Sequence, residues 1–125
     1  MKVSLGTLAR LLDENVAEIK FVRRNPKPGQ PATRRMLCTN SSDLLYSTKG
    51  QMALNFRGTS RPPKYNPAQK NLHITWDIFM QNYRTISLDS CDLISVIPAD
   101  DQFWNYFTEN LAGMSSTDKQ AFMNT

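Results

Sequence analysis

The sequence lacks the features of a membrane protein, a disulfide-rich secreted protein or a metalloprotein. No apolar run in its 125 residues approaches the ~20 that span a bilayer, and the amino terminus has no apolar segment of the kind that signal peptides carry. One histidine, His73, and two cysteines, Cys38 and Cys91, are too few for a zinc site or a disulfide framework. We therefore expect a cytoplasmic protein whose cysteines are small, buried core residues without a disulfide between them.

The common catalytic motifs are also missing. The chain contains no G-x-x-x-x-G-K-[ST], G-x-G-x-x-G, G-x-S-x-G or H-E-x-x-H motif. Asp77 and Asp89 fall near the ends of expected strands, where carboxylates often accept backbone N–H bonds in turns. A lone histidine in a strand is typical of a structural position. The sequence therefore predicts a protein that is not an enzyme, with no cofactor and no bound metal.

What the chain does have is an uneven charge distribution. Its net charge is +4, yet the segment from Lys20 to Lys70 holds eleven basic residues and one acid, a net charge of +10. The rest of the chain holds four basic residues and ten acids, a net charge of −6. This separation favours a molecule with a positive and a negative side, and a positive side commonly binds an anionic partner.

Hydrophobic periodicity predicts one α+β domain over residues 1–125. A helix capped by Ser4 is expected over 4–15, strands over 16–24, 32–39, 72–79, 83–88 and 93–97, and a carboxyl-terminal helix over 100–112. A proline-rich loop at 25–31 joins the first two strands, and a long, basic, proline-containing loop covers 55–71. About five short antiparallel strands hide their edges best in a small SH3-like or Sm-like β-barrel, with Trp76 filling its interior.

One hairpin resembles a known family. Trp76-Asp77-Ile78 followed by Tyr83-Arg84-Thr85-Ile86-Ser87-Leu88-Asp89-Ser90 is similar to the W-D … [WY]-R-x-[FI]-x-L-D-S pattern of the WYL-like family, which is widespread in bacteriophages. Residues 16–39 are similar to the strand pair that precedes it. The resemblance implies an Sm-like SH3 barrel, a phage origin, and regulation through nucleic acid or nucleotide-like ligands. It implies ligand contact through Arg84, whereas Ser87 and Ser90 stand where the relatives carry arginine.

The predicted binding surface has two parts. Four arginines fall on the two strands beside the proline-rich loop, where pairing of the strands would gather guanidinium groups suited to phosphate. The long loop interleaves aromatic and basic residues, as grooves for single-stranded nucleic acid do. With the arginine of the family motif, the candidate residues are Arg23, Arg24, Arg34, Arg35, Phe56, Arg57, Arg61, Lys64, Tyr65 and Arg84.

The favoured function is a phage-encoded regulator in the host cytoplasm that binds nucleic acid, DNA or RNA, through this basic face. The alternative is a protein-interaction module that binds and inhibits or redirects a host protein or complex. Its contact would be the same basic face or an aromatic stripe on the last helix, formed by Phe103, Trp104, Phe107 and Leu111. A helix that covers an open barrel end also needs such a stripe, and this structural interpretation of the stripe is favoured over an interface. The sequence leaves the oligomeric state open.

Overall fold

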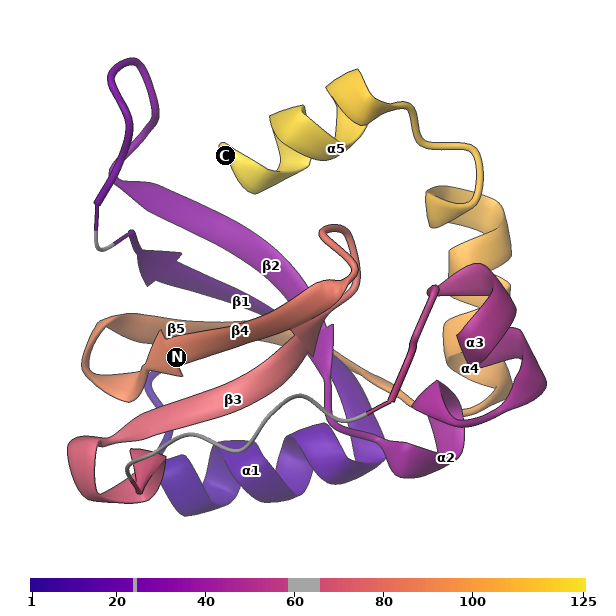
Figure 1. Ribbon diagram of the computed structural model, residues 1–125, viewed down its shortest axis with the longest axis horizontal. Coiled ribbons are helices and arrows are strands. Elements are labelled where there is room, and N and C mark those ends of the chain that lie inside the picture. Colours follow the sequence, from indigo (N-terminus) through magenta and orange to yellow (C-terminus); the bar gives the residue numbers. More distant parts are fainter. Residues whose placement is uncertain (24, 59–65) are drawn as a thin grey trace.

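Alternating apolar and polar residues build five strands, which the computed structural model joins into one antiparallel sheet (Figure 1). The structure describes residues 1–23, 25–58 and 66–125. The strands are β1 (Asn15–Val22), β2 (Thr33–Thr39), β3 (Leu72–Asp77), β4 (Asn82–Ser87) and β5 (Cys91–Pro98). Their order across the sheet is β4-β3-β2-β1-β5. The α+β class and the antiparallel sheet of five strands are thus confirmed.

The sheet is open, so the predicted closed barrel is not formed. Strands β4 and β5 are its two edges, and no pairing joins them in the described residues. Strand β2 pairs with β3 only through Cys38 with Asp77 and Thr39 with Trp76. The first half of β2 is therefore not paired with the β3–β4 hairpin. The helix α5 (Ser116–Met123) lies against β2 instead. Closure was expected to cover the edges, whereas here a helix covers part of one strand.

The helices begin at the side chains that cap them. Ser4 accepts a hydrogen bond from the Thr7 N–H at the start of α1 (Leu5–Glu14), as expected. Asp100 caps α4 (Asp101–Tyr106) through the Gln102 N–H, and α4 continues as a π-helical turn, η3 (Phe107–Leu111). The middle of the chain forms two further short helices, α2 (Ser42–Leu45) and α3 (Thr48–Ala53). Two 3₁₀ turns, η1 (Pro67–Lys70) and η2 (Leu88–Ser90), flank the second hairpin.

Two apolar cores lie on opposite faces of the sheet, because neighbouring strand residues point to opposite sides. The α1-side core joins Leu8 and Leu12 of α1 to strand residues such as Ile19 and Met36. The C-terminal core contains Val16, Leu37, Leu44, Trp76 and Phe103 and extends to the last helices. In Figure 1, α1 lies below the sheet and α5 above it. Trp76, 4% exposed, is buried as predicted.

No helix within the described ranges combines the length and apolar character needed to cross a membrane.

Candidate functional site

Asp77, the last residue of β3, forms hydrogen bonds and ion pairs with residues of the predicted basic face and of the adjoining turn. Its side chain is fully buried. Oδ1 accepts hydrogen bonds from the N–H groups of Phe79 and Met80, both at 3.1 Å, which confirms the predicted turn-capping role of this carboxylate. Oδ2 pairs with the guanidinium of Arg34 at 2.5 Å and lies 3.8 Å from Nε of Arg84. One carboxylate therefore holds the hairpin turn and joins arginines of two different strands.

Arg34 lies inside the protein, with 7% of its surface exposed. Its Nη2 contacts the Met123 sulfur at 3.1 Å as well as Asp77, and its guanidinium lies 5.9 Å from the ring centroid of Phe21. Its buried Nε has no hydrogen-bond partner among the described residues. An anion therefore has no direct access to this guanidinium in the arrangement seen here, although the sequence placed Arg34 on a binding surface.

Arg35, the next residue, is held on the other face of β2. Its Nη2 pairs with Glu18 at 2.6 Å, and its Nη1 donates to the Thr125 hydroxyl at 2.8 Å. The guanidinium lies 4.2 Å from the ring centroid of Phe122. Its side chain is 30% exposed, so this arginine is partly open to solvent.

Arg23, near the end of β1, bonds only to neutral acceptors. Its Nη1 donates to the carbonyls of Pro31 and Thr33 at 2.7 and 2.8 Å, and its Nη2 donates to the Asn124 side-chain oxygen at 2.8 Å. Burial lowers the pKa of Arg23, and the positive charge of Arg34 lowers it further. No carboxylate within the described ranges pairs with Arg23, and its charge is therefore uncompensated.

These contacts define an arginine cluster, made of Arg23, Arg34, Arg35 and Arg84. Glu18 and Asp77 are the acidic partners that the described residues supply, so four positive charges face two negative ones. The structure thus brings together three of the four arginines predicted for the two strands, together with the arginine of the family motif. The sequence missed the role of residues 122–125, which contact three of the four arginines from more than 85 positions away.

Of the long-loop part of the predicted surface, the structure describes Phe56 and Arg57. Phe56 is 3% exposed and packs edge to face on Trp76, Tyr46 and Tyr83, with ring centroids 5.1, 4.9 and 6.3 Å away. It belongs to the C-terminal core and offers no free ring for a base. Arg57 is exposed. The remaining candidates, Arg24, Arg61, Lys64 and Tyr65, lie outside the described residues.

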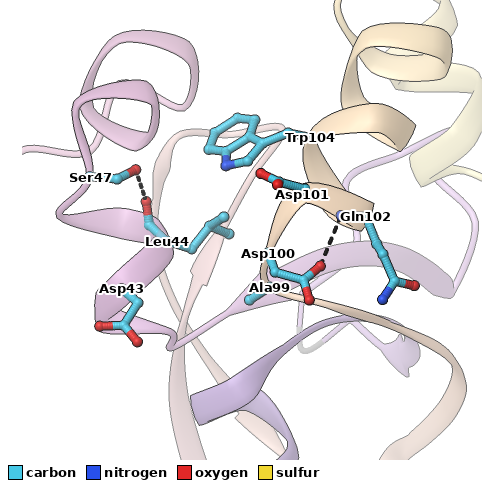
Figure 2. Close-up of a pocket in the computed structure, with 8 residues that line it drawn as sticks. All are labelled: Asp43, Leu44, Ser47, Ala99, Asp100, Asp101, Gln102 and Trp104. Carbon is cyan, nitrogen blue, oxygen red and sulfur yellow. Dashed lines mark hydrogen bonds between the residues drawn. The ribbon is translucent and has the colours of Figure 1, made fainter.

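A second candidate site is the α4 hollow, a depression of about 340 Å³ between α2 and the start of α4 (Figure 2). Trp104 forms one wall, and the Nζ of Lys49 lies 5.9 Å from its ring centroid. Asp100 is committed to its helix cap. The residues that line the hollow are Asp43, Leu44, Ser47, Ala99, Asp100, Asp101, Gln102 and Trp104. Of the predicted aromatic stripe, Phe103 and Leu111 are buried, while Trp104 and Phe107 are partly buried.

The remaining reactive groups are in structural positions. Cys38 and Cys91 are buried free thiols; burial raises the pKa of Cys38 to about 12 and also raises that of Cys91. Nε2 of His73 lies 3.1 Å from the side-chain oxygen of Asn40, and burial lowers the pKa of this histidine. In the part of the chain that the structure describes, no three His, Cys, Asp or Glu side chains form a group that could hold a metal ion.

No family model, no curated protein and no solved structure matches this chain. Its function is therefore inferred from the residues themselves.

Proposed function

We propose that this protein is a non-enzymatic regulator, encoded by a phage, that binds nucleic acid through the arginine cluster and the cations beside it. The observation that carries the proposal is the charge imbalance of the cluster. Three of the four guanidinium groups pair with two carboxylates, and the fourth, that of Arg23, has neutral acceptors alone. A phosphate group supplies the negative charge that the cluster lacks, and guanidinium groups bind phosphate with paired, charge-assisted hydrogen bonds.

Cations that are at least partly open to solvent, inside and outside the cluster, support this proposal. Lys20 lies opposite Arg35 in the β1–β2 register. The Arg84 side chain is 45% exposed, and Arg57 is exposed further along the chain. Neither Lys20 nor Arg57 forms an ion pair with a described residue, so both are available to phosphates. We propose that Arg24, Arg61, Lys64 and Tyr65, which lie outside the described residues, also contact the nucleic acid.

The family resemblance stands as part of this proposal. Trp76 and Tyr83 are register partners whose ring centroids lie 5.1 Å apart in an edge-to-face contact. The neighbouring motif residues, Asp77 and Arg84, are electrostatic partners across the same hairpin. The two contacts across the hairpin therefore explain the spacing of the W-D and Y-R pairs. A family that shares this hairpin would keep that spacing.

Binding to nucleic acid should weaken steeply with salt, and neutralising one of these cations should make that dependence shallower. We expect Lys20→Gln and Arg84→Gln each to reduce the slope of log K against log [salt] by about 0.7 for single-stranded DNA or RNA. Arg10→Gln is the matched control, because Arg10 is exposed on α1, is not part of the arginine cluster and forms no ion pair with a described residue. The measurement is fluorescence anisotropy with single- and double-stranded oligonucleotides over a salt series. Equal slopes for all three variants would refute this surface.

The α4 hollow favours a second candidate function, contact with a host protein. Trp104 stands at an acidic rim, and a partly buried tryptophan beside a depression is a common anchor for a protein partner. If this function is correct, a lysine-rich peptide quenches Trp104 fluorescence, and Asp101→Asn weakens that binding about threefold by removing one charge. Lys20→Gln should leave peptide binding unchanged. Quenching that is insensitive to Asp101→Asn would exclude the hollow as the contact.

A further inference from the structure

The end of the chain occupies the donors that a phosphate would use. Asn124 accepts from Nη2 of Arg23, Thr125 accepts from Nη1 of Arg35, and the sulfur of Met123 contacts Nη2 of Arg34. Phe122 adds a ring contact with the guanidinium of Arg35. Consecutive residues 122–125 thus contact three arginines on the β1–β2 hairpin.

All of these contacts are neutral. An amide oxygen, a hydroxyl and a thioether bind guanidinium less strongly than a charged oxygen does, since hydrogen bonds to ionised acceptors are roughly twice as strong. Arg34 also keeps a buried Nε with no partner within the described ranges. Apart from the ion pairs of Arg34 with Asp77 and of Arg35 with Glu18, the three arginines therefore contact weak acceptors where strong ones would bind better.

The segment that carries these acceptors is lightly attached. Helix α5 has 8 residues, fewer than the ~12–15 that an isolated helix needs for stability in water. Met123 is its one buried residue, and most of its other side chains are exposed. Its main apolar contact beyond Met123 is an edge-to-face pair of Phe122 with Phe79, whose centroids lie 5.0 Å apart. Such an element is typical of those that open locally while the domain stays folded.

We propose that residues 115–125 form a displaceable cover over an oxyanion site made by Arg23, Arg34 and Arg35, and that a nucleic-acid phosphate takes the place of Asn124 and Thr125. This proposal rests on the proposed function, because it names how the same arginines become available. In the covered state the exposed cations make the first contacts, and release of α5 adds the three buried or half-buried guanidinium groups. The cover therefore sets the affinity of the protein for its ligand.

Hydrogen exchange of the full-length protein tests this directly. When a 12-nucleotide single-stranded DNA saturates the protein, amides of 117–124 should exchange at least about threefold faster, because α5 leaves β2. Amides of α1 should be unaffected and serve as the internal control. Slower or unchanged exchange at 117–124 in the complex would overturn the cover, since the ligand would then bind over a closed segment.

Two substitutions at one residue should act in opposite directions. Asn124→Ala removes the acceptor for Arg23 and should tighten DNA binding about threefold, whereas Asn124→Asp adds a charged acceptor and should weaken it about fivefold. Gln120→Glu makes the same charge change at an exposed position of α5 and should weaken binding less than about twofold. Equal effects of Asn124→Asp and Gln120→Glu would contradict the cover.

A second probe separates failure of the cover from failure of the proposed function. If DNA binds with no change in exchange at 117–124, the cover is wrong and the nucleic-acid proposal stands. If no nucleic acid binds the wild type or Asn124→Ala, the nucleic-acid proposal falls, and inorganic pyrophosphate then tests the oxyanion site alone. Faster exchange at 117–124 with pyrophosphate supports the cover, and unchanged exchange overturns it.

Discussion

Asp77→Ala is expected to lower the free energy of unfolding by about 3–5 kcal/mol, the usual cost of removing one partner from a buried ion pair. The substitution leaves Arg34, 7% exposed, with a charge inside the protein and no carboxylate. It also leaves the N–H groups of Phe79 and Met80 without their acceptor in the β3–β4 turn. Urea denaturation followed by circular dichroism measures the loss.

Two further variants separate these causes. Asp77→Asn keeps an oxygen that can accept from the turn but removes the charge, so its cost should lie between those of the wild type and Asp77→Ala. Arg84→Gln should cost less than about 0.5 kcal/mol, because its side chain is 45% exposed and lies 3.8 Å from Asp77. A loss below about 1 kcal/mol for Asp77→Ala would show that Arg34 finds another partner or reaches water.

Gly50→Ala is expected to destabilise the fold by about 3 kcal/mol, the upper part of the range for overpacking. A Cβ at this position would overlap the Leu44 carbonyl oxygen and lie 2.7 Å from that of Leu45. Both atoms belong to the backbone of α2, so the clash cannot be relieved by a side-chain rotation. The two short helices would have to separate, and with them Leu44 and Leu45 of the C-terminal core.

Gly6→Ala is the matched control for this substitution. Gly6 lies within α1, and nothing stands within 4 Å of a Cβ added there. Alanine should therefore stabilise the protein by about 0.5–1 kcal/mol, because glycine in a helix costs more backbone entropy. The same denaturation experiment measures both variants. If Gly50→Ala is as well tolerated as Gly6→Ala, α2 and α3 are not packed as closely as the structure has them.

Local patterns predicted most of the secondary structure, because their causes are local. Ser4 and Asp100 cap the helices that follow them within two or three residues, and Asp77 caps a turn of the same length. The second hairpin follows from strict alternation along β3 and β4. The closed barrel was predicted from the need to cover strand edges, and that need does not say whether a strand or a helix does the covering.

Local sequence patterns could not predict which basic residues are buried and which are exposed. Arg34 and Arg35 look alike in the sequence, yet the first is buried against Asp77, 43 positions away, and the second is partly exposed. Phe56 sits in a basic, aromatic segment typical of a nucleic-acid groove, but its ring fills the C-terminal core. These outcomes depend on contacts between distant segments, above all on residues 122–125, whose composition gives no sign that they meet the β1–β2 hairpin.

The apolar residues are divided between two cores on opposite faces of the sheet, and each core contains residues whose signal reports on its unfolding. Both tryptophans, Trp76 and Trp104, belong to or pack on the C-terminal core, whereas both cysteines, Cys38 and Cys91, belong to the α1-side core. Intrinsic fluorescence therefore follows one side of the sheet, and the rate at which a thiol reagent labels the cysteines follows the other. Neither reporter needs an added label, so the two together distinguish concerted unfolding of the molecule from loosening of a single layer.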